Sequence, residues 1–191
     1  KDHGLGPGDR IGYLGLNDPK FLEVLYASAL IGAIFVPINY RLTAQEIAFI
    51  ANDAGLKMLF ADESSAAQLE SGLEGLRCDC LIGVNFESAT WLPLKTELPE
   101  SGGATDALET AHPVKADDVV MIMYTSGTTG RPKGATLTHG NIFWNLLNAK
   151  FMEETMRCAT LTCAPLFHIG GLNVTTHPSL LSGVQVVLHK E

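Results

Sequence analysis

Short apolar runs alternate with amphipathic stretches along the first 84 residues, and this alternation limits the folds open to the chain. Four runs have the apolar character of buried strands: residues 10–16, 33–38, 57–61 and 81–84. Between the first two runs, Leu22, Leu25 and Ala29 recur at the spacing of one helix face. Strand–helix–strand alternation is typical of βαβ units. The sequence therefore predicts an α/β fold, with a largely parallel sheet and flanking helices.

The first two predicted helices carry signals for where they begin and end. Asp18 is a good N-cap, and Pro19 suits the first helical position because its fixed φ matches a helix. Thr43 and Glu46 have the spacing of a capping box. Gly55 can adopt the left-handed conformation that ends the second helix. Local sequence therefore fixes these helix ends.

The second half of the chain continues the alternation after a segment without periodicity. Residues 100–116 hold Ser, Gly, Thr and Pro, and we expect a surface linker inside one domain. The elements predicted after it are a strand at 119–123, a returning strand at 134–138, a helix from Thr138 to about residue 150, a strand at 161–165, a helix at 169–181 and a strand at 184–188.

The segment Tyr124-Thr-Ser-Gly-Thr-Thr-Gly-Arg-Pro-Lys-Gly134 directly follows the apolar run 119–123. Small residues let a backbone close around an anion and offer it N–H groups. Hydroxyl side chains add donors, and Lys133 adds a compact positive charge. This composition predicts a phosphate-binding loop.

The loop departs from the G-x-x-x-x-G-K-[ST] pattern of the commoner phosphate loop. Counting from Gly127, Pro132 stands at the second glycine position, and Gly134 follows the lysine where Ser or Thr is required. A returning strand, rather than a helix, is expected after Lys133. We therefore predict a hairpin-type phosphate loop. The alternative for this composition is a Gly/Thr-rich turn with a solvated lysine.

His168 follows the end of the predicted strand at 161–165, where open α/β sheets bind ligands. Gly170 and Gly171 next to it allow close approach of the backbone. On spacing alone, the sequence favours an ordinary loop residue at His168 over a ligand-binding one.

These segments resemble signature elements of the adenylate-forming superfamily, which contains acyl- and aryl-CoA synthetases, peptide-synthetase adenylation domains and beetle luciferases. Residues 122–133 are similar to the family's phosphate loop, and residues 164–172 to its P-x-F-H-x-x-G element. Residues 8–46 are more loosely similar to the early part of the same domain. The resemblance implies part of the large N-terminal domain of an adenylate-forming enzyme, which binds ATP and the acyl group.

The resemblance also implies a reaction. The parent enzyme would use ATP and Mg²⁺ to convert a carboxylic acid into an acyl-AMP, and would then pass the acyl group to coenzyme A. The form of residues 165–172 favours an acyl-CoA synthetase acting on a fatty acid. Two alternatives stay open: an adenylation domain of a peptide synthetase, and a non-catalytic nucleotide-binding module.

Site residues follow from the same resemblance. It assigns phosphate binding to Thr125, Ser126, Gly127, Thr128, Thr129, Gly130 and Lys133. It places His168 where the triphosphate meets the acyl carboxylate, and makes His168 and Lys133 the predicted catalytic residues. Gly170, Gly171 and Leu172 would flank the acyl pocket.

Four neighbouring residues are expected to have structural roles. His139 and Asn141 should close the hairpin and start the following helix. Phe143 and Trp144 are expected to pack in the core, and lining of an acyl tunnel is the alternative. The remaining histidines show no metal-ligand spacing, so no metal site is predicted.

Composition narrows the partners. A net charge of −8 argues against a nucleic-acid partner, so ATP must be held by local donors. The longest apolar run, residues 29–38, is far shorter than the ~18 residues that suggest a membrane span. The four cysteines favour free thiols of an intracellular protein, and we expect a cytoplasmic location.

The later family elements do not occur in these 191 residues. They include the Y-G-x-T-E segment with the family's magnesium-binding acid, and the C-terminal lysine that serves adenylation. We therefore expect residues 1–191 to be a fragment of the N-terminal domain, without the C-terminal domain and inactive alone. Oligomerisation stays possible.

Overall fold

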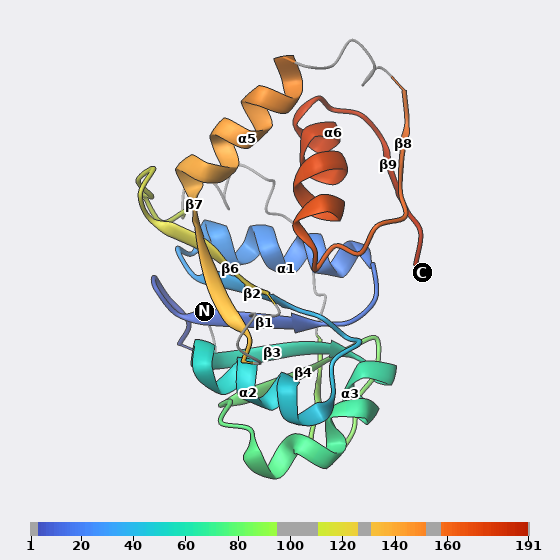
Figure 1. Ribbon diagram of the computed structural model, residues 1–191. Helices are drawn as coiled ribbons and strands as arrows, with labels where there is room; N and C mark the ends of the chain where they lie inside the picture. The colour runs from blue at the N-terminus through green and yellow to red at the C-terminus, as the bar shows by residue number, and fades with distance from the viewer. Residues whose placement is uncertain (1–3, 95–110, 126–130, 152–157, 191) are drawn as a thin grey trace, which may run out of the picture.

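The computed structural model describes residues 4–94, 111–125, 131–151 and 158–190 (Figure 1). Its main sheet has seven strands: β1 (Arg10–Leu14), β2 (Ile34–Ile38), β3 (Leu56–Asp62), β4 (Cys80–Val84), β5 (Leu92–Pro93), β6 (Val119–Thr125) and β7 (Lys133–Thr138). They lie in the order β5-β4-β3-β1-β2-β6-β7. All neighbouring pairs are parallel except β6 and β7, which are antiparallel. The predicted largely parallel sheet is confirmed.

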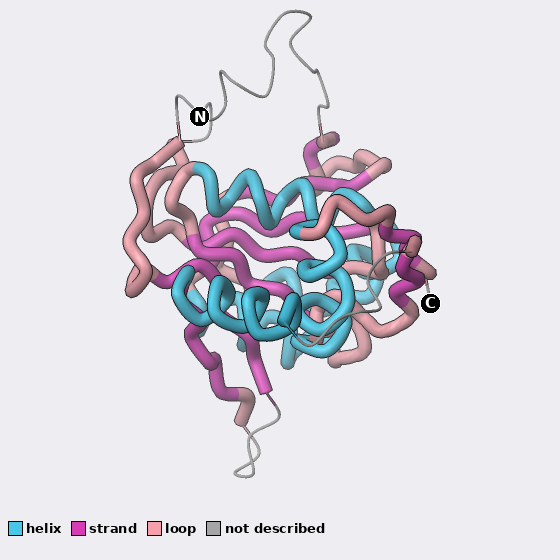
Figure 2. The backbone as a smooth tube through the Cα atoms, turned by 90° about the horizontal axis from the view of Figure 1, so that it is seen from above, coloured by secondary structure: helices cyan, strands magenta, loops and turns pink. Residues whose placement is uncertain are grey.

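Helices cover both faces of this sheet (Figure 1). The α-helices are α1 (Pro19–Leu30), α2 (Ala44–Ala54), α3 (Glu63–Leu69), α5 (His139–Phe151) and α6 (His177–Leu181), and a 3₁₀-helix, η1, spans Glu70–Gly75. Helices α1, α5 and α6 lie on one side, and α2 and α3 on the other. Figure 2 shows helices crossing over the strands when the molecule is seen from above.

Two apolar clusters, one on each face, form the core. On the α1 face, Phe21 packs edge-on against Tyr13 and Phe35, with ring centroids 5.1 and 5.0 Å apart. On the α2 face, Ile47 and Ile50 are buried against strand residues. A sheet buried on both faces needs apolar residues along whole strands, which explains the continuous apolar runs in the sequence.

The helix ends are as predicted. Asp18 caps α1 by accepting a 2.8 Å hydrogen bond from the Lys20 N–H. Thr43 and Glu46 form a full capping box at the start of α2. Gly55 ends α2 with φ = 64°, in the left-handed region. Each signal acts within one helical turn, so it could be identified without tertiary information.

The region after α5 differs in detail from the prediction. The strand expected at 161–165 is the shorter β8 (Thr160–Thr162), which pairs in parallel with β9 (Val186–Leu188) as a separate small sheet. The helix expected at 169–181 is divided into a π-helical segment, η2 (Gly170–Thr176), and α6. Helices α3 and η1 and strand β5 were not predicted from the sequence. These elements are short, and short elements carry little periodic signal.

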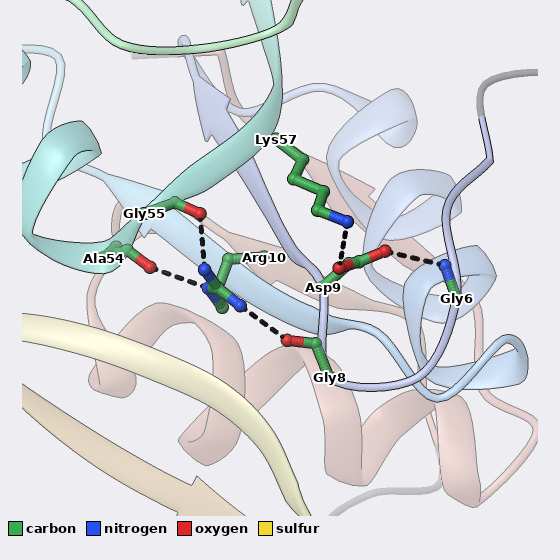
Figure 3. A network of polar contacts seen from close by, with 7 residues as sticks. All are labelled: Gly6, Gly8, Asp9, Arg10, Ala54, Gly55 and Lys57. Carbon is green, nitrogen blue, oxygen red and sulfur yellow. Dashed lines mark hydrogen bonds and ion pairs between the residues drawn. The ribbon is translucent and has the colours of Figure 1, made fainter.

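A polar network anchors the amino ends of β1 and β3 (Figure 3). The Arg10 guanidinium donates hydrogen bonds of 2.8 Å each to the carbonyls of Ala54 and Gly55 at the end of α2. Next to it, Lys57 Nζ lies 2.7 Å from Asp9 Oδ1. A cation suits a helix C-terminus because the last carbonyls lack helical partners. The amino ends of β1 and β3 are therefore held in place by contacts within the chain.

The predicted linker at 100–116 falls mostly outside the described residues. Its described end, residues 111–116, contains no helix or strand. His112 donates a 2.7 Å backbone hydrogen bond to the Leu30 carbonyl, so the segment passes the end of α1.

Candidate functional site

The predicted phosphate loop joins β6 and β7. Thr125, the last residue of β6, pairs across the hairpin with Lys133, the first residue of β7. Both residues are exposed. Ser126, Gly127, Thr128, Thr129 and Gly130 lie outside the described residues. The expected returning strand is present, so the hairpin form of the loop is confirmed.

One residue before the loop, Tyr124 connects the hairpin to the α2 face. Tyr124 pairs with Gly134, and a Cβ built on Gly134 would lie 3.1 Å from Tyr124 Cζ. The ring therefore rests on the glycine backbone. Its hydroxyl donates a 2.6 Å hydrogen bond to Asp53 Oδ2. Burial raises the pKa of Tyr124, and the Asp53 carboxylate raises it further, so the phenol stays protonated.

His168 lies in a turn between β8 and η2. Its backbone N–H donates to the Pro165 carbonyl at 3.1 Å. Its Nδ1 accepts a 3.1 Å hydrogen bond from the Gly170 N–H. A neutral imidazole that accepts at Nδ1 carries its proton on Nε2. The exposed His168 ring therefore offers one N–H donor to its surroundings.

The backbone is tightly packed where η2 begins. A Cβ on Gly171 would collide with the Pro165 carbonyl and lie 2.7 Å from the Ala164 carbonyl. Gly171 is buried, and Leu172 is fully buried in the core. Thr176 donates its hydroxyl to the Gly171 carbonyl at 2.8 Å. π-Helical segments are rare and are frequent at functional sites.

A cleft of about 370 Å³ lies at the carboxyl ends of β2 and β6. Its lining residues come from these strand ends, from α2 and from the His168 turn: Pro37, Asn39, Leu42, Glu46, Ile50, Tyr124, Thr125, Pro132, Phe167 and His168. The cleft brings Thr125 together with His168. Lys133, Gly170, Gly171 and Leu172 do not line it.

An aromatic pair borders this cleft. The rings of Tyr40 and Phe167 meet edge to face, with centroids 5.4 Å apart. Arg41 lies 5.2 Å from the Tyr40 ring centroid, a distance typical of a cation–π contact. These contacts connect the loop after β2 to the His168 turn.

The family is identified by a match that covers the whole chain. Residues 1–191 match the family described as AMP-binding enzyme. The chain belongs to this family. The predicted resemblance to adenylate-forming enzymes is thereby confirmed.

Two curated relatives of this AMP-binding chain are CoA ligases by name. A feruloyl-CoA synthase from Amycolatopsis sp is 38% identical over 192 residues, which cover 97% of this chain and 35% of that protein. An indoleacetate–CoA ligase from Aromatoleum aromaticum is 36% identical over 190 residues, covering 99% of this chain and 37% of that protein. The chain therefore spans about a third of the length of these curated relatives.

Two solved structures share the fold of this AMP-binding chain. One is a Rhodopseudomonas palustris protein assigned as a long-chain-fatty-acid CoA ligase, with a TM-score of 0.75, 28% identity, and coverage of 100% of this chain and 47% of that chain. The other is the N-terminal domain of FACL13 from Mycobacterium tuberculosis, with a TM-score of 0.72, 27% identity, and coverage of 98% and 46%. The predicted N-terminal-domain fold is confirmed.

The described residues contain neither a metal-binding cluster nor a membrane-spanning helix. Within the described ranges, no cluster of three or more His, Cys, Asp or Glu side chains could hold a metal ion. No helix in the described part of the chain has the length and apolar character to cross a bilayer.

The prediction for Phe143 and Trp144 was wrong. They are 58% and 61% exposed, and they pack against each other with ring centroids 5.4 Å apart. Helix α5 instead packs Ile142 against the core, and adjacent positions on a helix point in different directions. Asn141 has the expected structural role, because its N–H donates to Thr138 Oγ1 at 3.1 Å.

Two residues with long-range contacts to segments of the cleft, Asn17 and Asp53, were not predicted from the sequence. Asn17 hydrogen-bonds to the His168 turn, and Asp53 accepts from Tyr124. The buried His177 of α6 was not predicted either, and neither of its ring nitrogens is hydrogen-bonded to a described residue. Asn17 follows the strand-like run 10–16 and so lies at the ligand-binding edge of the sheet, which was the available signal. The Asp53–Tyr124 contact and the burial of His177 could not be identified from local sequence.

Proposed function

We propose that the protein containing this chain activates a carboxylic acid with ATP and transfers the acyl group to coenzyme A. The observation that carries the proposal is the cleft that joins Thr125, at the start of the phosphate loop, to His168. The family and the two CoA-ligase relatives support the same chemistry.

The reaction needs a better leaving group than oxide on the acyl carbon. A carboxylate oxygen attacks the α-phosphorus of ATP, the bond from that phosphorus to the bridging oxygen breaks, and pyrophosphate leaves. A thiolate then attacks the acyl carbon and releases AMP. Because such phosphoryl transfer depends mainly on positioning and charge stabilisation, a chain with donors around a cleft can contribute strongly.

Each proposed role follows from the chemistry of the side chain. Thr125, the loop residues Ser126–Gly130 and Lys133 would hold the β- and γ-phosphates through N–H, hydroxyl and ammonium donors. His168, with its proton on Nε2, would donate a hydrogen bond to the acyl carboxylate and orient it for attack. Gly170, Gly171 and Leu172 would support the acyl side of the same site.

The acid itself is a finer proposal. The motif at 165–172 favours a fatty acid, and a fatty-acid CoA ligase is among the structural neighbours. A second candidate is an aromatic acid. The two curated relatives are named for ferulate and indoleacetate, and the Tyr40–Phe167 pair next to the cleft offers rings against which an aryl group could pack.

The test is acid-dependent pyrophosphate release by the full-length parent protein. It would be measured with ATP, Mg²⁺ and coenzyme A over a panel of fatty and aryl acids. We expect pyrophosphate, AMP and an acyl-CoA as products, with the preferred acid deciding between the two candidates. Release driven by amino acids without coenzyme A would favour a peptide-synthetase adenylation domain. No release with any acid, or ADP and phosphate as products, would reject activation through an acyl-AMP.

The same assay on residues 1–191 alone addresses the fragment. We propose that this portion is inactive, because the chain spans only about a third of its curated relatives. Turnover by residues 1–191 close to that of the parent would overturn this part of the proposal.

A further inference from the structure

Asn17 lies between β1 and α1, and its buried side chain makes three hydrogen bonds. Its Oδ1 accepts from the Leu166 N–H at 2.8 Å. Its Nδ2 donates to the Ala164 carbonyl at 3.1 Å and to the His189 carbonyl at 2.9 Å. Asn17 is only 8% exposed. The partners lie between 147 and 172 residues away, so this one amide joins the β1–α1 connection to two distant segments.

Two of the three partners belong to the turn that carries His168. Leu166 is held two residues before His168, and Leu166 is itself 1% exposed. The Ala164 carbonyl that accepts from Asn17 also faces Gly171, where a Cβ would lie 2.7 Å away. The turn is therefore fixed from the β1 side by Asn17 and from the η2 side by Gly171.

An amide suits this position better than its closest replacements. A carboxylate at Asn17 would lose both N–H donors and would face two carbonyl oxygens that also carry negative partial charge. A leucine of similar size would leave the Leu166 N–H and two carbonyls unpaired in a largely buried site. An unpaired buried polar group is costly, so the turn would be expected to move rather than keep its place.

We propose that Asn17 is a positioning residue that sets the place of His168 relative to Thr125 at the cleft. This inference rests on the proposed function, since it assigns Asn17 a part in orienting the acyl carboxylate. Asn17 would act through the turn and not by touching substrate. It does not line the cleft, whereas His168 does.

The chain offers a matched control in Asn52. Its Nδ2 donates to the Gly75 carbonyl at 2.6 Å, and its Oδ1 accepts from the Arg77 N–H at 2.7 Å. Asn52 thus bridges a distant loop with the same chemistry, but on the α2–η1 side and away from His168. Asn17→Asp and Asn52→Asp can be compared in the full-length parent, once unfolding measurements show that the two variants are equally stable.

The kinetic test separates positioning from general destabilisation. In the parent protein, Asn17→Asp should lower kcat/KM for the acid by about tenfold to a hundredfold, because small misplacements of a reacting group are expensive. The KM for ATP should change by less than about twofold, since none of the side-chain hydrogen bonds of Asn17 goes to the β6–β7 hairpin. In a His168→Ala background, the Asn17→Asp effect on the acid should largely disappear. Asn52→Asp should leave all these values near those of the wild type.

Two results would overturn the inference. One is an equal loss from Asn17→Asp with and without His168; the other is an equal loss from Asn52→Asp. If the parent shows no acid-dependent pyrophosphate release at all, the proposed function fails, and a second readout still decides on Asn17. The readout is the NMR spectrum of the parent with labelled histidine rings, in which the His168 signal is the one that is absent from His168→Ala. Asn17→Asp should shift that signal, and Asn52→Asp should not. An unmoved His168 signal in Asn17→Asp would reject the positioning role.

Discussion

The Tyr124 hydroxyl donates a 2.6 Å hydrogen bond to Asp53 Oδ2, which joins the end of β6 to α2. The two residues are 71 positions apart in the sequence. The contact lies immediately before the predicted phosphate loop, at the carboxyl end of β6. It therefore couples the placement of the loop to a helix that also lines the cleft.

A double-mutant cycle measures this coupling. Tyr124→Phe and Asp53→Asn should each lower the free energy of unfolding, and the pair should lose less than the sum by roughly 0.5–1.5 kcal/mol, the usual worth of one hydrogen bond. Urea unfolding of the four proteins gives the value. Tyr26→Phe is the control, because the Tyr26 hydroxyl makes no hydrogen bond with the described residues, and it should combine additively with Asp53→Asn. Additivity of Tyr124→Phe with Asp53→Asn would contradict the coupling.

Even the smallest side chain at position 134, in Gly134→Ala, should lower the stability of the chain. A Cβ there would lie 2.8 Å from Ile122 Cγ2 and 3.1 Å from Tyr124 Cζ, so Gly134→Ala must displace one of them. We expect a loss of about 1–3 kcal/mol in unfolding free energy, as for overpacked sites. Gly75→Ala is the matched control, since a Cβ at Gly75 meets nothing within 4 Å. Equal stability of the two variants would show that the hairpin accommodates the methyl group.

Lys133 should matter for ATP more than for the acid. In the full-length parent, Lys133→Ala would remove the proposed charge-assisted contact to phosphate, worth roughly 1.5–3 kcal/mol. We therefore expect kcat/KM for ATP to fall by about tenfold or more. Lys57→Ala serves as the control, because Lys57 pairs with Asp9 at the amino ends of β3 and β1, whereas the predicted phosphate loop follows the carboxyl end of β6. A change confined to the dependence on acid would remove Lys133 from the phosphate site.

His177 should make stability depend on pH. Burial lowers the pKa of His177 to about 4, so the folded chain resists protonation that the unfolded chain accepts near pH 6.5. The stabilisation is complete above about pH 6.5 and falls as the pH falls toward 4, by a total on the order of 3 kcal/mol. His139, whose pKa burial also lowers, adds in the same direction.

The check is urea unfolding between pH 7 and pH 5, where most carboxylates stay ionised in both states. His177→Leu should flatten most of the slope. An unchanged slope in His177→Leu would assign the pH dependence to other groups.

The sequence by itself determined the features that depend on near neighbours. The capping box at Thr43 and Glu46, the left-handed Gly55 and the returning strand after Lys133 each involve residues within a few positions of one another. The alternation of apolar runs with amphipathic stretches likewise predicted the largely parallel sheet. Such signals survive without tertiary information, because steric and hydrogen-bonding preferences act locally.

Only the tertiary structure decided which distant residues meet. The Asn17–Leu166 and Tyr124–Asp53 contacts depend on the strand order and on which helix covers which face, and neither leaves a local pattern. The same holds for exposed Trp144 and buried His177, since a side chain's polarity does not fix the face on which its helix packs. Residue types and spacing therefore predicted a phosphate loop and singled out His168. Long-range packing, which reflects the summed burial of the whole chain, decided that Thr125 and His168 line one cleft.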